Sequence, residues 1–405
     1  MRPSRGQVIG TLGAVALLAA LVVVGRLGAP GRPAQVSVPA STAATPPTPP
    51  PTADTTGTTV GLPAPPRLRG VPLAGTGLAA LLVPDPSPSA VPGLFWLDSG
   101  RLTPIGGLPS GGCYLPIRLP HGWVLAHQTD QGCPEPSMRT QFYLLADGAS
   151  SATRLPVTAD WVLAGGDDTR LWLVTFLGQP DPTSGRPPPH AVQQVDVAGH
   201  PYGPRYLVPD GYAAWQGVGG GSLLLILPGQ GPPETSRFAL WNPGSGRILH
   251  RYDRVLAATA TTVAWVAAAC SPQRCPVHLS DLVSGADTQV AAPRGVWVNA
   301  GAFSPDGRYL AVVFGGVDAV RPATQVRVGV IDAATRRLLS VSGAVMSGGD
   351  FGLAVTWSPD GAWLLLAAQD RPGQYTQLAA WRPGDRVLHV PRQPPTGQHL
   401  APAAG

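Results

Sequence analysis

The chain has 405 residues, of which 44% are hydrophobic and 13% charged, with 51 glycines and 48 prolines. This composition excludes wholesale disorder, and its frequent chain reversals favour many short strands over long helices. The formal net charge is +5, but residues 1–66 hold four Arg and one Asp, so the other 339 residues carry 24 Arg against 22 acidic residues. No concentrated basic face is predicted, which excludes nucleic acid as a partner.

The N-terminal segment, residues 1–28, predicts a membrane anchor. Twenty residues from Gly6 to Gly25 carry no charge, and as a helix they span about 30 Å, the thickness of a bilayer core. Arg2 and Arg5 precede this segment, which keeps the N-terminus in the cytoplasm by the positive-inside rule. The alternative is a cleaved signal peptide. An uncleaved anchor is favoured because Pro30 follows the small residues at the candidate cleavage site.

Residues 29–66 predict a disordered linker. Eleven prolines stand among Thr, Ala, Ser and Gly, so the segment has too few apolar side chains to form a core. Such a chain populates extended polyproline II conformations. The predicted role is a stalk that holds the folded domain, residues 67–392, outside the membrane, so the predicted location is a single-pass protein of the cell membrane with an extracytoplasmic domain.

One pattern recurs through residues 67–392: a short β-rich segment, an Asp or Asn, a turn, and a second short strand. The polar positions of the seven copies are Asp98, Asp147, Asp196, Asn242, Asp281, Asp332 and, with Arg in place of the acid, Arg382. Their spacings are 49, 49, 46, 39, 51 and 50 residues. A near-constant period of this length with short strands is typical of propeller blades. The fold class predicted is therefore all-β, a seven-bladed β-propeller of four-stranded antiparallel blades, followed by a disordered tail, 393–405.

Two of the copies share a sharper motif in which an aromatic residue precedes Ser-Pro-Asp-Gly. The motif residues are Ser304, Pro305, Asp306 and Gly307 in one copy and Ser358, Pro359, Asp360 and Gly361 in the other. Pro presets φ, Asp bonds its own backbone, and Gly takes the positive-φ position, so these residues are predicted to serve the turn. The motif resembles the TolB-like and WD-type propeller repeats of bacterial envelope proteins over residues 295–390. That resemblance implies a propeller and a protein-binding role.

The four cysteines are predicted to form disulfides. Cys113, Cys133, Cys270 and Cys275 are even in number in a domain expected outside the membrane. Three pairings are possible, and the two local pairings are the most economical. Zinc is the alternative, but neither pair has C-x-x-C spacing and His278 is the only nearby histidine. No metal and no cofactor are predicted.

The longest predicted loops join the second and third strands of each blade and gather on one face. They span 84–92, 129–139, 178–190, 228–235, 269–276, 315–325 and 370–375. Loops on a rigid scaffold are frequent recognition sites, so this face is predicted to bind a partner. The candidate binding residues are Asp130, Arg139, Asp181, Arg186, His190, Arg274, Asp318, Arg321, Asp370 and Arg371.

Two functions follow from this organisation. The first is a non-catalytic scaffold or sensor of the cell envelope that binds an envelope protein or a cell-wall ligand. The alternative is a propeller-fold enzyme, lactonase-like or lyase-like, that acts on a small molecule or glycan in the central channel. No serine has Gly at both flanking offsets of a G-x-S-x-G motif, and no catalytic residues are predicted. His121 and His127, at an even offset, are a weak metal-pair candidate, and carboxylates or histidines on the innermost strands would favour the enzyme.

Overall fold

The structure is a computed structural model. It describes residues 68, 70–83, 91–119, 121–128, 140–166, 169–178, 186–228, 237–268, 270–271, 275–293, 296–315, 326–346, 353–371 and 374–391. The predicted anchor, linker and C-terminal tail lie outside these residues. Among the residues described, no helix is long and apolar enough to cross a membrane.

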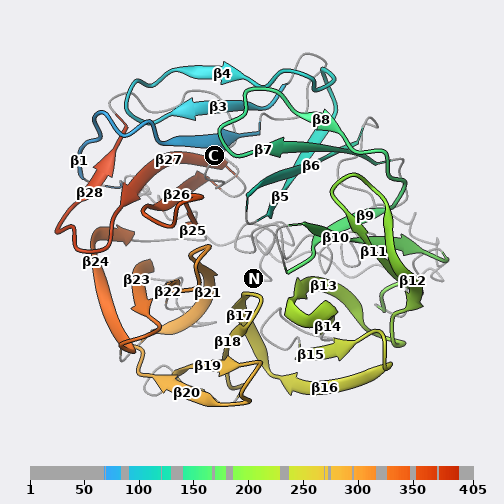
Figure 1. The fold of residues 1–405 in the computed structure, drawn as a ribbon. Coiled ribbons are helices and arrows are strands. Elements are labelled where there is room, and N and C mark those ends of the chain that lie inside the picture. The colour runs from blue at the N-terminus through green and yellow to red at the C-terminus, as the bar shows by residue number, and fades with distance from the viewer. Residues whose placement is uncertain are drawn as a thin grey trace, which may run out of the picture.

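Seven sheets surround a central axis and form a seven-bladed β-propeller, as predicted (Figure 1). Blade 2 consists of β5 (Cys113–Leu119), β6 (Gly122–Gln128), β7 (Gln141–Ala146) and β8 (Thr153–Arg154). Blade 3 consists of β9 (Trp161–Ala164), β10 (Arg170–Phe176), β11 (His190–Asp196) and β12 (Pro201–Leu207). Blade 4 consists of β13 (Ala213–Val218), β14 (Ser222–Leu227), β15 (Arg237–Asn242) and β16 (Arg247–Tyr252). A 3-10 turn, Gly219–Gly221, joins β13 to β14.

Blades 5 and 6 have the same four-stranded plan. Blade 5 consists of β17 (Arg254–Ala258), β18 (Thr262–Val266), β19 (Val277–Asp281) and β20 (Asp287–Val290). Blade 6 consists of β21 (Trp297–Phe303), β22 (Tyr309–Gly315), β23 (Val326–Asp332) and β24 (Arg337–Met346). Strand pairing within each blade is antiparallel in chain order, with the first strand near the axis and the last at the rim (Figure 1).

Blades 1 and 7 differ from this plan, and they account for how the ring closes. Blade 1 has three strands, β2 (Ala79–Leu82), β3 (Gly93–Trp96) and β4 (Leu102–Pro104). Blade 7 has five: β25 (Leu353–Trp357), β26 (Leu364–Arg371), β27 (Gln374–Trp381), β28 (Leu388–Val390), and β1 (Gly70–Pro72), which pairs in parallel with the outer edge of β28. The N-terminal strand therefore completes the last blade, and blade 1 keeps three strands.

The core lies between neighbouring blades because alternate residues of a strand face opposite sides of its sheet. On β6, Trp123 and Leu125 pack with blade 1, whereas Val124 and Ala126 pack with blade 3. Similar apolar clusters join the other blades. This packing fixes each blade against both neighbours and makes the propeller a rigid support for side chains in the seams between blades.

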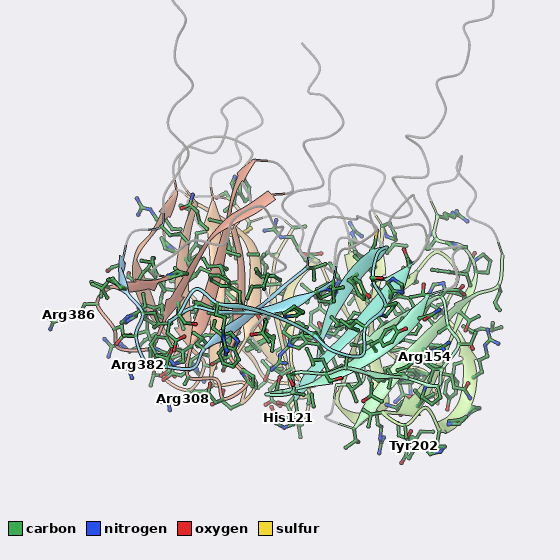
Figure 2. All side chains as sticks on the ribbon, turned by 90° about the horizontal axis from the view of Figure 1, so that it is seen from above. His121, Arg154, Tyr202, Arg308, Arg382 and Arg386 are labelled. Carbon is green, nitrogen blue, oxygen red and sulfur yellow. A yellow bond between two sulfur atoms is a disulfide. The ribbon has the colours of Figure 1, made fainter. Side chains whose placement is uncertain are left out.

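The Ser-Pro-Asp-Gly residues form the turns between the first and second strands of blades 6 and 7. Asp360 Oδ1 accepts hydrogen bonds from the Ser358 hydroxyl and the Ala362 N–H, and Gly361 has φ +68°. Asp306 makes the same contacts in the first copy. Figure 2 places Arg308, next to this turn, on the same face as His121 and Arg382, which belong to turns of blades 2 and 7.

Candidate functional site

Most of the predicted binding-face residues lie outside the described residues. These are Asp130, Arg139, Asp181, Arg274, Asp318 and Arg321. The predicted loop 370–375 is largely strand, because β26 continues through Asp370 to Arg371 and β27 begins at Gln374. Arg186 is exposed just before β11. The predicted binding face therefore stays a prediction.

The prediction of His190 as a loop residue is wrong. His190 is the first residue of β11 and only 3% exposed. Its Nδ1 lies 2.9 Å from the Pro188 carbonyl oxygen, and the Ala214 N–H on blade 4 donates to its Nε2. Burial lowers the pKa of His190, although the backbone contact to Pro188 acts in the opposite direction. His190 is thus a neutral side chain that links two blades, because both of its ring nitrogens meet backbone groups.

The disulfide Cys270–Cys275 is present, as predicted, in the connection between β18 and β19. Cys113, at the start of β5, is also disulfide-bonded. Cys133 is the one other cysteine of the chain, and it lies outside the described residues. The local pairing of the cysteines in blade 5 excludes zinc at that pair.

Carboxylates or histidines on the innermost strands would favour catalysis in the central channel. Over β2, β5, β9, β13, β17, β21 and β25, the described residues include no Asp, Glu or His. His121 lies in the turn before β6, and His127 is buried on β6 with its Nε2 at 2.9 Å from the Gly111 carbonyl oxygen. The described residues include no group of three or more metal-ligating side chains. Among the described residues, the candidate site lies away from the axis.

Such a site lies in the seam between blades 4 and 5. His278 on β19 is 9% exposed, and its Nδ1 is 2.7 Å from Oδ2 of Asp287 on β20. The Ser280 hydroxyl donates to Oδ1 of the same carboxylate at 2.7 Å, and the Trp265 indole N–H donates to Ser280 at 2.8 Å. A continuous chain of hydrogen bonds therefore connects three adjacent strands of blade 5.

Aromatic rings from both blades hold the imidazole in place. The Trp265 ring stacks on His278 with centroids 4.1 Å apart, and Tyr252 of β16 contacts Trp265 at 5.9 Å. His250 lies 4.5 Å from Tyr252. Stacked rings at these separations are attractive and restrict rotation. The imidazole is consequently fixed both by the ring below it and by the carboxylate at Nδ1.

The electrostatics of the seam favour an ionised Asp287. Burial raises the pKa of Asp287, but hydrogen bonds from His278 and Ser280 outweigh it and hold the pKa below its ordinary value. Burial, together with the Asp287 carboxylate, raises the pKa of Tyr252 to about 12. At neutral pH the seam therefore holds one carboxylate beside a neutral phenol.

Nε2 of His278 has no hydrogen-bond partner among the described residues. With Nδ1–H donating to Asp287, Nε2 is the nitrogen that can accept a proton. Two other His–Asp pairs differ from this one. His200 with Asp196 is largely exposed, and His389 with Asp385 lies within a single turn. The His278 pair alone, among the described pairs, bridges two strands.

The sequence interpretation missed this site, although part of its signal was present. His278 and Ser280 alternate on one strand and so share a face, which could have been read from the sequence. Asp287 lies on the next strand, and its pairing with Ser280 depends on the turn length between them. The contact with Tyr252 of blade 4 depends on the packing of whole blades, which no local pattern specifies.

The fold defines the class of protein as a seven-bladed β-propeller. No family model and no curated protein sequence matches the chain. Among solved structures, an acylaminoacyl peptidase in complex with Z-Gly-Gly-Phe-chloromethyl ketone matches with a TM-score of 0.53 and 11% identity, over 81% of this chain and 52% of that one. The orthorhombic crystal form of the Pyrococcus horikoshii acylaminoacyl peptidase matches with a TM-score of 0.50 and 11% identity, over the same shares.

The β-propeller domain of the Trilobed protease from Pyrococcus furiosus matches with a TM-score of 0.49 and 8% identity, over 82% of this chain and all of that one. The chain spans about half the length of the acylaminoacyl peptidases it matches. At these identities the likeness shows the fold. The TolB-like or WD-type resemblance is not confirmed.

The comparisons overturn the expected function of a non-catalytic envelope scaffold or sensor. The similar structures are those of acylaminoacyl peptidases, and so of enzymes. The expectation followed from the absence of a recognisable catalytic motif and from the weight given to the long loops.

Proposed function

We propose that this protein is a propeller-fold enzyme and that His278, oriented by Asp287, is its acid–base residue. The observation that carries the proposal is the geometry at the imidazole: a carboxylate 2.7 Å from Nδ1, and Nε2 without a partner among the described residues. A general base needs a fixed tautomer and an accessible nitrogen, and an adjacent carboxylate supplies the first.

The side chains support the hydrolysis of a small acyl compound such as a lactone, ester or amide. A water molecule gives a proton to Nε2 of His278 while its oxygen adds to the carbonyl carbon. The imidazolium that forms is stabilised by the ionised Asp287, which Ser280 holds in place. The proton then passes from Nε2 to the leaving oxygen or nitrogen, which restores the neutral imidazole.

The proposed acid–base residue lies in the seam between blades 4 and 5, whereas the enzyme considered from the sequence would act in the central channel. The innermost strands offer no carboxylate or histidine among the described residues, whereas the seam offers both on strands whose register is fixed. The similarity to acylaminoacyl peptidases supports acyl chemistry as the first class to test. It does so as an analogy of fold.

The test uses the purified full chain with p-nitrophenyl acetate, γ-butyrolactone and an N-acetylated amino-acid p-nitroanilide. Hydrolysis of at least one probe is expected. His278→Gln should lower kcat at least about 100-fold, since general acid–base catalysis contributes about 10²–10⁴-fold. Asp287→Asn should lower kcat in the same direction while keeping a side chain of the same shape.

His200→Gln is the matched control, because His200 also contacts an aspartate, at 3.0 Å, but on the exposed edge of blade 3. It should leave kcat unchanged. Wild-type protein inactive on all three probes, or His278→Gln with wild-type kcat, would overturn the proposal.

A further inference from the structure

A second site lies between blades 1 and 2, apart from the His278 seam between blades 4 and 5. The structure has a cavity of about 130 Å³ there, walled by Trp96 and Leu94 of β3 and by Trp123 and Leu145 of β6 and β7. Asp147 and Pro359 also line it. A cavity of this size is about that of an engineered apolar cavity that binds benzene.

Two glycines stand at the edge of the cavity. Gly77 and Gly148 line it, and a Cβ placed on either would meet no atom within 4 Å. Both have positive φ, +64° and +75°, so larger residues are disfavoured at these positions. The backbone conformation therefore favours glycine at these two positions of the cavity edge.

The indole walls are held before any ligand arrives. The Trp96 indole N–H donates to Thr103 at 3.1 Å, and the Arg118 guanidinium lies 4.8 Å over the Trp123 ring. Trp123 is only 3% exposed. Walls that need no rearrangement lower the entropic cost of binding. Flat aromatic walls in such a space favour an aromatic ring as the occupant.

The charged side chains at the cavity wall limit the class of ligand that can bind. Arg118 binds Asp147 through both of its terminal nitrogens, at 2.8 and 3.2 Å, so the charges of these two residues neutralise each other at the Trp123 wall. A charged ligand at this wall would lose hydration without gaining an unpaired opposite charge from Arg118 or Asp147. The carboxylate oxygens of Asp147 still have lone pairs that accept a hydrogen bond. A neutral ring with one hydrogen-bond donor therefore matches both the walls and the polar edge.

We infer that this cavity, between blades 1 and 2, is a binding site for a small neutral phenol, with the ring between the indoles and the hydroxyl donating to Asp147. The inference does not depend on the proposed acid–base role of His278. The His278→Gln variant should bind phenol as the wild type does, so the two proposals can fail separately.

The experiment is saturation-transfer NMR of phenol on the full chain, with the affinity measured by titration. Ala146 lies exposed on the cavity rim, so Ala146→Trp places a ring in the mouth without disturbing the core. We expect it to weaken phenol binding at least tenfold. Ala198→Trp, at an exposed position in the corresponding turn of blade 3, is the matched control and should bind phenol as the wild type does.

Toluene has the same ring without the donor and should bind more weakly than phenol if Asp147 accepts the hydroxyl proton. Competition by N-acetyltyrosine amide at lower concentration than phenol would assign the site to a tyrosine side chain of a peptide and would overturn the free phenol as ligand. No saturation transfer to phenol, or equal binding by wild type and Ala146→Trp, would overturn the site itself.

Discussion

The attachment of β1 to blade 7 depends on Gly70. A Cβ at this position would lie 2.2 Å from the carbonyl oxygen of Leu388 and 2.6 Å from its carbon, both backbone atoms of β28. Real Cβ atoms do not approach backbone so closely, and neither atom can move without breaking the strand pair. We therefore predict that Gly70→Val detaches β1 from blade 7.

The expected loss can be worked from the contacts. β1 and β28 share three register pairs, the Leu73 N–H donates to the Val390 carbonyl at 2.9 Å, and Leu73 is 1% exposed. Each hydrogen bond contributes about 1 kcal/mol net and the burial of Leu73 about 2 kcal/mol. The freed residues regain conformational entropy, which offsets part of this sum. The free energy of unfolding should therefore fall by about 2 kcal/mol.

Urea unfolding followed by intrinsic fluorescence measures this loss, and hydrogen exchange at Leu73 shows whether β1 is the part released. Gly178→Val is the matched control, because its nearest atom is Pro189 Cδ at 3.9 Å and its φ is not positive. Equal stability of Gly70→Val and wild type, with the Leu73 N–H still protected from exchange, would refute the predicted detachment of β1 from blade 7.

Four further outcomes follow from described contacts. Because burial lowers the pKa of His190, the folded state binds fewer protons than the unfolded state; the free energy of unfolding should fall as pH drops below about 6.5, and His190→Gln should flatten that slope in urea titrations. Replacing Cys270 and Cys275 by Ser should cost about 2 kcal/mol, measured by thermal unfolding, because the closed loop is short. Asp360→Ala removes two turn hydrogen bonds and should lower the unfolding free energy by about 1–2 kcal/mol in urea. His278→Leu with Asp287→Leu should change the unfolding free energy in urea by less than about 1 kcal/mol while losing hydrolysis, since the Asp287 side chain is 38% exposed and a partly exposed pair contributes little to stability.

The blades could be predicted from the sequence because their turns are local. Asp281 and Asp332 end the third strands of blades 5 and 6, and each carboxylate accepts hydrogen bonds from N–H groups two and three residues later. Asn242 accepts a bond from the Ser245 N–H in the same way. Such contacts depend only on neighbouring residues, so the repeated polar position marks the turn wherever it occurs.

The ring closure and the candidate site could not be predicted because both depend on contacts between distant segments. β1 pairs with a strand more than three hundred residues away. The repeated turn pattern does not say which blade the N-terminal strand joins, because that choice is set by tertiary packing. His190 was misplaced for the same reason, since its partner Ala214 belongs to the next blade.

Blade 4 shows that the fold does not require the polar residues of the blade 5 seam. In blade 4, the pair Trp241 and Ile248 occupies the third- and fourth-strand positions that Ser280 and Asp287 occupy in blade 5. Trp241 and Ile248 pack into an apolar cluster, so the same geometry is satisfied without any charge. The buried imidazole of His278 costs desolvation that an apolar residue at this position avoids. Polar groups at positions where the fold accepts apolar ones point to chemistry rather than to packing, and this is the physical reason to place the acid–base residue at His278.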